Sequence, residues 1–265
     1  MNPLTFLSNK LDNFPHTMLR RISSIFEQIA PKSLEPAWDN TGILVEPFKL
    51  NESGKILLTI DLTSAVLEEA ISRNISVVVA YHPVIFRGIK KIDLNDPKQK
   101  IVSSCIHHGI GVFSPHTRLD AIDNGINDWL IKPFTGETII PEDRMGRIIK
   151  LKDPLSGIKL IGIVKEHLKL KHVQVANVLS TVMTVAVCAG SGGSVFAKLD
   201  ADCYITGELD HHSVLDFAER GKMVIVTNHT NTERGYLSIL KSILEQHQIT
   251  EVYISEVDKD PLSVV

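Results

Sequence analysis

The sequence predicts an α/β fold of two related lobes, each containing a βαβ unit, with mixed sheets flanked by helices. Residues 76–83 and 222–229, far apart in the chain, each contain an apolar run in which apolar and polar residues do not alternate. Such runs are typical of parallel strands that crossover helices bury on both faces. A histidine, His82 or His229, follows each run. Because ligands bind beyond the carboxyl ends of strands in open α/β sheets, we expect both histidines in a central cleft.

The first half of the chain supplies a surface helix and the first βαβ unit. Apolar residues at helical spacing predict an amphipathic helix over residues 17–30. Residues 38–45 are a polar turn that leads into a strand, and residues 55–61 form a further strand. Thr63 is placed to cap the next helix, which returns the chain to a parallel strand at 77–79. This crossover is expected to be right-handed.

The second half repeats this plan. Strands are predicted over residues 179–187, 201–206 and 224–226, with a helix around 214–218 between the last two. The repetition indicates a weak internal duplication, so that two similar lobes face one another across the cleft that would hold a metal ion. Any two βαβ units would also look alike, and this alternative stays open.

The chain is expected to form a single domain over residues 1–265. The segment between the lobes contains several prolines and charges, and we interpret it as a connection with its own strands at 147–151 and 159–164. The predicted limits are about 17–130 for lobe 1, about 131–178 for the connecting segment, and about 179–265 for lobe 2, which ends in a helix from about 239 and a strand at 251–255.

Composition excludes several classes of protein. The net charge of -3 gives no general attraction to nucleic acid or to anionic membranes, so neither partner is expected. No apolar run approaches the roughly 18 residues that a spanning helix needs. Cys105, Cys188 and Cys203 show no C-x-x-C spacing and are interpreted as small buried residues. We therefore expect a cytoplasmic protein; a nuclear or mitochondrial pool, with a weak transit peptide at the N-terminus, stays open.

Histidines and carboxylates gather at three predicted strand ends. The first end offers His82, the third strand-like run, 109–114, leads to His116 and Asp120, and the last offers His229 and Glu233. Residues four apart share one face if the strand yields directly to a helix, so each of the two pairs could converge on one cation. Imidazole and carboxylate suit a divalent ion such as zinc, iron or manganese.

Other polar motifs carry less weight. We favour capping by Asp210 over metal binding for the adjacent His211 and His212, and a structural role for His107 and His108 at a helix C-terminus. The glycine-rich residues 190–194 could cradle a phosphate, but a tight turn between strand and helix is the stronger interpretation. No nucleophile elbow is visible.

Together these motifs resemble the NGG-one-interacting factor three family, also described as GTP cyclohydrolase I type 2 homologues. The pieces that carry the resemblance are short and run in family order: Trp38-Asp39-Asn40-Thr41-Gly42, Ala80-Tyr81-His82-Pro83, Ser114-Pro115-His116-Thr117-Arg118-Leu119-Asp120, Gly190-Ser191-Gly192-Gly193-Ser194, Thr206-Gly207-Glu208-Leu209-Asp210-His211-His212, and His229-Thr230-Asn231-Thr232-Glu233-Arg234-Gly235.

The resemblance implies two related lobes around a dinuclear metal centre and assembly into homo-hexamers. It implies His82, Asp120, His229 and Glu233 as ligands. Tyr81 departs from the bacterial pattern, where a second histidine stands. We expect the second ion to bind weakly or not at all, because a neutral phenol ligates poorly. In the alternative, Tyr81 points into the core or hydrogen-bonds one of the ligands, and His116 completes both metal sites.

We expect a hydrolase-type site that holds one or two divalent ions and acts on a small nucleotide-like or heterocyclic substrate. His116 would serve as a general acid or base, or as an extra ligand. The rival interpretation is a non-catalytic metal-binding scaffold or a regulatory partner of other proteins.

Overall fold

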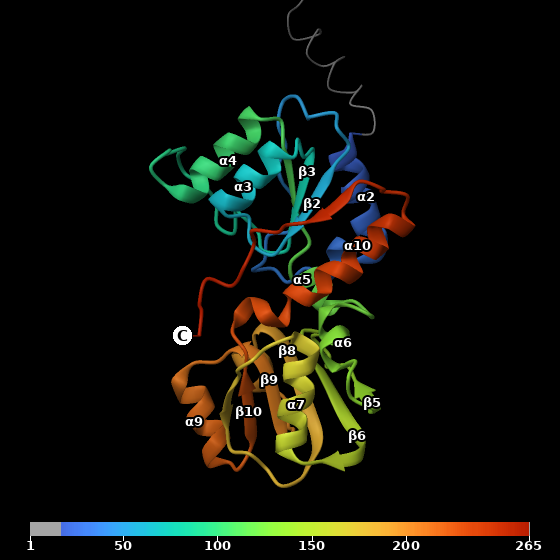
Figure 1. Ribbon diagram of the computed structural model, residues 1–265, viewed down its shortest axis with the longest axis vertical. Helices are drawn as coiled ribbons and strands as arrows, with labels where there is room; N and C mark the ends of the chain where they lie inside the picture. Colours follow the sequence, from blue (N-terminus) through green and yellow to red (C-terminus); the bar gives the residue numbers. More distant parts are fainter. Residues whose placement is uncertain (1–16, 265) are drawn as a thin grey trace, which may run out of the picture.

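The computed structural model describes residues 17–264 and shows the predicted mixed α/β fold. Two sheets lie one above the other along the long axis of the molecule (Figure 1). The expectation of a transit peptide falls largely on residues 1–16, which lie outside the described residues. Among residues 17–264, no helix has the length and apolar character that crossing a bilayer requires.

The first sheet has the strand order β1-β4-β3-β2-β11. All neighbours are parallel except β1 and β4. Its strands are β1 (Gly42–Val45), β2 (Ile56–Thr59), β3 (Val77–Ala80), β4 (Gly111–Ser114) and β11 (Val252–Ile254). Alternate strand residues pack against different helices, so this sheet is buried on both faces as its unbroken apolar runs predict.

Helices cover both faces of this sheet (Figure 1). On one side lie α3 (Ser64–Ser72) and α4 (Pro97–His107), and on the other α2 (Met18–Ile29) and α10 (Leu237–Gln246). The predicted cap is confirmed, because the Thr63 hydroxyl accepts a hydrogen bond from the Val66 amide at 3.3 Å.

The second sheet has the order β5-β6-β8-β9-β10-β7. Its three central strands, β8, β9 and β10, are parallel, and the others join antiparallel. The strands are β5 (Gly136–Ile139), β6 (Arg147–Leu155), β7 (Gln174–Ala176), β8 (Val182–Ser191), β9 (Cys203–Glu208) and β10 (Met223–Val226). The helices of this half are α5 (Thr117–Ala121), α6 (Ile126–Ile131), α7 (Gly157–Leu168), α8 (Gly193–Phe196) and α9 (His211–Glu219).

Short 3₁₀ helices connect some of these elements. They are η1 (Lys32–Leu34), η2 (His229–Thr232) and η3 (Arg234–Tyr236). The last two follow β10 directly and lead into α10, so they carry the chain from the second sheet back to the first.

The predicted strand at residues 159–164 is wrong, because this segment lies inside α7. Ser156 caps the helix by accepting a hydrogen bond from the Lys159 amide at 3.3 Å. Leu160 and Val164, four residues apart, are buried against the second sheet. The run of isoleucine and valine suggests a strand locally, but helical spacing of the buried positions decides the outcome.

The sheets also divide the chain differently from the predicted lobes. Strands β5, β6 and β7 come from the segment predicted to connect the lobes, yet they extend the second sheet. At the other end, β11 pairs with β2 in the first sheet, with Val252 opposite Ile56. The C-terminus therefore returns to the first lobe, a long-range pairing that no local pattern specifies.

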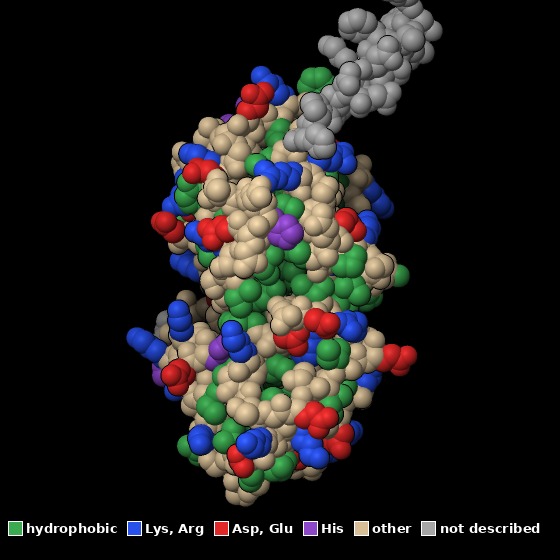
Figure 2. Space-filling model, turned by 90° about the vertical axis from the view of Figure 1, so that its right-hand side faces the viewer, with side chains coloured by type: hydrophobic (Ala, Val, Ile, Leu, Met, Phe, Trp, Pro, Cys, Tyr) green, Lys and Arg blue, Asp and Glu red, His purple; other side chains and the backbone are tan. Residues whose placement is uncertain are grey.

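One hydrophobic core joins the two lobes. Its buried residues include Leu58 and Val79 of the first sheet together with Val185 and Ile205 of the second. Figure 2 shows hydrophobic side chains gathered at the waist where the lobes meet. The relative position of the lobes is therefore fixed by shared packing.

We predict that Arg118→Met lowers the free energy of unfolding by about 2 kcal/mol. The fully buried guanidinium donates to the carbonyl oxygens of Ala30 and Phe26 at the end of α2, at 2.6 and 3.2 Å. Methionine keeps the apolar stem but leaves these acceptors without their donor. Urea unfolding measures the change.

The matched control is Arg220→Met, which removes an exposed pair with Asp216 inside α9. It should have little effect, since exposed ion pairs contribute little to stability. Equal stability of the two variants would contradict the structural role given to Arg118.

Candidate functional site

The ends of β3 and β10 bring two histidines together from different sheets. Beyond β3, the amide of His82 donates to the Ile60 carbonyl at 3.0 Å, which extends the strand pairing into the site. Beyond β10, Asn228 has a φ of 69°, and the chain turns into η2 at His229. The two imidazole centroids lie 5.1 Å apart. The predicted meeting of the two strand ends is therefore observed.

Glu233 completes a group that could hold a metal ion. Ligand atoms of His82, His229 and Glu233 all lie within 4.8 Å of one another. The Nε2 atom of His229 is 3.3 Å from one carboxylate oxygen, and the Nε2 atom of His82 is 3.5 Å from the other. The strand yields directly to a 3₁₀ helix between His229 and Glu233, and the two side chains meet.

Two further carboxylates orient the imidazoles. The Nδ1 atom of His82 is 3.0 Å from Asp61, and that of His229 is 3.3 Å from Glu208. Both rings therefore direct Nε2 toward Glu233, an arrangement common around metal-binding histidines. Asp61 and Glu208 were not predicted from the sequence as site residues, although each lies at or just beyond the end of a predicted strand, as the histidines do.

The carboxylates dominate the electrostatics of this group. Burial alone would lower the pKa of His82, but the adjacent Asp61 and Glu233 carboxylates outweigh it and raise the pKa to about 10. Burial also opposes the charged form of His229, yet contact with Glu233 and Glu208 raises its pKa to about 9. For Glu233, the two histidines overcome burial and hold the pKa below its usual value.

The group fits a divalent cation. The side chain of Glu233 is 1% exposed, and its Oε2 atom, 3.5 Å from His82 Nε2, accepts no hydrogen bond from any residue within 17–264. A buried carboxylate oxygen without a partner is costly, and a cation between the two imidazoles would satisfy it. Gly190 lies beside it with a φ of 62°, and a Cβ there would fall 2.8 Å from both Glu233 Oε1 and His229 Nε2. The predicted glycine-rich turn thus leaves room for the ligand atoms.

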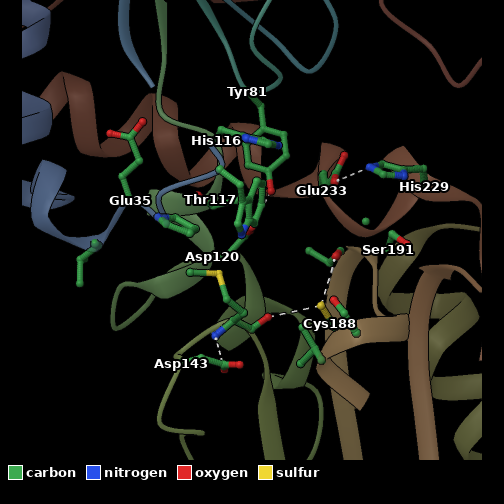
Figure 3. A pocket seen from close by; sticks show the side chains of 18 of the residues that line it. Glu35, Tyr81, His116, Thr117, Asp120, Asp143, Cys188, Ser191, His229 and Glu233 are labelled. Carbon is green, nitrogen blue, oxygen red and sulfur yellow. Dashed lines mark hydrogen bonds and ion pairs between the residues drawn. The ribbon is translucent and has the colours of Figure 1, made fainter. Parts of the chain in front are cut away.

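Asp120, the fourth predicted ligand, lies outside this group. Its Oδ1 atom accepts a hydrogen bond from the Tyr81 hydroxyl at 2.7 Å, which turns the carboxylate toward Tyr81 instead (Figure 3). Burial raises the pKa of Asp120 to about 7, although the Tyr81 hydrogen bond works against this. Burial, together with the nearby Asp120 and Glu233 carboxylates, raises the pKa of Tyr81 well above its ordinary value. Tyr81 therefore stays a neutral donor.

His116 forms a pair with Asp39 beside the group of His82, His229 and Glu233. Its Nδ1 atom is 2.6 Å from the fully buried Asp39 carboxylate, which Thr117 also contacts. Burial would raise the pKa of Asp39, but contacts with His116, Thr117 and the Asn40 amide together outweigh it and hold the pKa below its usual value. The backbone of His116 has a φ of 37°, a conformation that L-residues rarely adopt and that is often found at functional sites. Asp39 belongs to a motif that the sequence analysis quoted without giving it a role.

Two cavities meet at the histidines. One, of about 460 Å³, is lined by Tyr81, Asp120, His229 and Glu233 (Figure 3). The other, of about 750 Å³, is lined by His82 and by the C-terminal residues Lys259 and Pro261. His116 and His229 line both cavities. A bound substrate could therefore reach the group from either side.

The remaining predicted features have structural roles. Asp210 caps α9 by accepting hydrogen bonds from the amides of His212 and Ser213, as favoured from the sequence. His107 and His108 end α4. The three cysteines are buried and free.

The fold and the site together define an α/β protein of two facing sheets with a histidine–carboxylate group that could hold a metal ion. The chain belongs to the Duf34/NIF3 family (NGG1p interacting factor 3), whose sequence model matches residues 17–261. The resemblance found from the short motifs is therefore confirmed.

Similar proteins occur in yeasts and animals. The chain is 40% identical to "Protein NIF3 homolog" of Schizosaccharomyces pombe, over 92% of this chain and 97% of the relative. It is 30% identical to "NIF3-like protein 1" of Homo sapiens, over 93% and 92% of the two chains. Among solved structures, reduced HcgD from Methanocaldococcus jannaschii has a TM-score of 0.78 at 25% identity, covering 90% of this chain and 97% of that one.

We predict that Gly190→Ala abolishes tight metal binding. The new methyl group would occupy the space beside the ligand atoms, and the positive φ adds strain. Isothermal titration with Zn²⁺ measures the loss. Gly162→Ala is the control, because a Cβ there meets nothing within 4 Å; unchanged binding in both variants would contradict the location of the site.

We predict that metal binding at pH 7 releases about two protons. His82 and His229 have pKa values of about 10 and 9 in the metal-free protein, so both hold a proton that the ion must displace. Affinity should therefore rise steeply with pH, by up to ~100-fold per unit, until these pKa values are passed.

Titration calorimetry in buffers of different ionisation enthalpy counts the released protons. Glu208→Gln removes a carboxylate that raises the pKa of His229 and should lower the count. Binding that releases no protons at pH 7 would show that the imidazoles are not the ligands.

Proposed function

We propose that this chain is a metal-dependent hydrolase acting on a small nucleotide-like or heterocyclic molecule. The observation that carries the proposal is the buried Glu233 carboxylate, which lies between the Nε2 atoms of two carboxylate-oriented histidines and whose Oε2 atom accepts no hydrogen bond from the described residues. Two histidines and one glutamate are a frequent ligand set of hydrolytic zinc sites. A divalent ion held there supplies Lewis acidity and lowers the pKa of a water molecule.

Proton transfer falls to His116. Asp39 contacts its Nδ1 atom, which leaves Nε2 as the nitrogen that can take up or deliver a proton. The His116 ring centroid lies 5.6 Å from that of His82, and the residue lines both cavities. A substrate beside the metal ligands would therefore lie within reach of this imidazole.

Aromatic side chains around His116 favour a planar substrate. Trp38 is 61% exposed, unusual for so large an apolar side chain, and its ring centroid lies 6.4 Å from that of His116. Phe86 lies 6.2 Å from His116 on the side of the other cavity. Exposed rings at the entrance of a polar site can stack on a heterocycle.

Tyr81 favours one tightly bound ion over two. Its hydroxyl donates to Asp120 and stays protonated, so it supplies no ligand where the bacterial pattern has a histidine. Asp120 keeps its other carboxylate oxygen free of this hydrogen bond, so a second ion would have Asp120 but no Tyr81 ligand.

We predict that His116→Ala keeps the bound metal but lowers turnover by about 100-fold or more, because it removes only the proton-transfer group. His229→Ala should lose both metal and turnover. Elemental analysis gives the metal content, and a panel of nucleotides and heterocyclic amides gives hydrolysis rates.

The control is His211→Ala, which changes an exposed histidine of α9 that lines neither of the two cavities. It should match the wild type in both measurements. Wild-type protein that holds metal but hydrolyses none of the panel would favour the scaffold interpretation over the hydrolase.

A further inference from the structure

We infer that Asp258 is a positioning residue for the metal site, because one of its carboxylate oxygens ties together the two chain segments that carry the ligands. This inference rests on the metal site proposed above. Asp258 belongs to the C-terminal segment, residues 255–262, which follows β11 and runs from the first lobe toward the second (Figure 1).

The first tie reaches the segment that carries His82. The Ile60 amide donates to Asp258 Oδ2 at 2.7 Å. Because β11 ends at Ile254, this amide lies beyond the last strand pair and the carboxylate takes the place of a strand neighbour. The carbonyl of the same Ile60 accepts the His82 amide at 3.0 Å, and the next residue, Asp61, orients the His82 ring. Asp258 thus fixes the backbone that aims the first imidazole.

The second tie reaches the segment that carries His229 and Glu233. Arg234, which follows Glu233 directly, pairs through NH1 with the same Oδ2 atom of Asp258 at 2.7 Å. The Asp258 side chain in this pair is 1% exposed. A buried, charge-assisted contact of this kind has a defined geometry, so it restricts the position of the neighbouring Glu233.

The C-terminal segment makes a further contact with the same turn. Thr230, which follows His229, donates to Asp260 Oδ2 at 2.9 Å. The Thr230 hydroxyl also accepts from Arg234 NH2 at 3.1 Å. The neighbours of His229 and Glu233 are therefore linked to each other and to the tail. Second-sphere contacts of metal ligands commonly change affinity when they are lost.

The same segment offers a matched control. Glu256 pairs with Arg73 at 2.7 Å, and its side chain is 75% exposed. This contact also holds the tail to the first lobe, but Arg73 ends α3 and neighbours no proposed ligand. Comparing variants of Asp258 and Glu256 distinguishes an effect on the position of the ligands from an effect on the attachment of the C-terminal segment to the first lobe.

The test is a Co²⁺ titration of the full chain, followed by the visible absorption of the bound ion and by thermal unfolding. Asp258→Asn should weaken Co²⁺ binding by about 10-fold or more and alter the absorption spectrum, because the ligands lose their fixed geometry. Glu256→Gln removes one charge from the same segment and should leave both unchanged. Asp258→Asn with wild-type affinity and spectrum, whatever its melting temperature, would overturn the inference.

A second variant covers the case in which Asp258→Asn does not fold. Thr230→Val keeps the volume of the side chain and leaves no charge without its ion-pair partner, yet it removes the contacts to Asp260 and Arg234. It too should weaken Co²⁺ binding by about 10-fold, and wild-type affinity would count against the inference. If the wild-type chain binds no Co²⁺, both the proposed metal site and the positioning role are wrong. If the wild-type chain binds Co²⁺ and both variants bind it equally well, the positioning role alone is wrong.

Discussion

The structure depends on a carboxylate, Glu233, that is removed from water between two imidazoles. A buried charge is strongly unfavourable unless partners compensate it, and His82 and His229 provide that compensation from separate lobes. The same contacts raise the pKa values of both histidines. The group that could hold a metal ion therefore forms only when the two lobes meet, because His82 comes from one lobe and His229 and Glu233 come from the other.

The backbone around Glu233 leaves room for the close contact between this carboxylate and the histidines. Gly190 has a positive φ and leaves the space that His229 and Glu233 occupy. A Cβ on Gly207 would lie 2.6 Å from the Cα of His229, so this position also requires glycine. Thr232 donates to the His229 carbonyl and accepts from the Gly190 amide, which holds the turn against β8. The glycine-rich motif is thus a packing requirement of the site.

Carboxylates that contact the Nδ1 atoms of the histidines determine which ring nitrogen is available to a ligand or a proton. Asp61 and Glu208 contact Nδ1 of His82 and His229, and Asp39 contacts Nδ1 of His116. In each case the opposite nitrogen is the one left for a ligand or a proton. The Tyr81 hydroxyl donates to Asp120, which lies outside the group formed by His82, His229 and Glu233. The site consequently has three carboxylate-oriented imidazoles around one buried glutamate.

The sequence by itself determined the fold class and the strand ends, and its four predicted ligands include the three residues of the group that could hold a metal ion, because apolar periodicity and the polar residues that follow it are local signals. It also identified the family from short motifs. The sequence did not predict the features that depend on contacts between distant segments. Residues 159–164 are helical because the helix packs against the second sheet, and β11 pairs with the first sheet. Only the tertiary structure decided that Asp120 pairs with Tyr81 and that Asp258 meets both Ile60 and Arg234. These contacts join residues far apart in the chain, and their geometry follows from how the two lobes pack rather than from any local pattern.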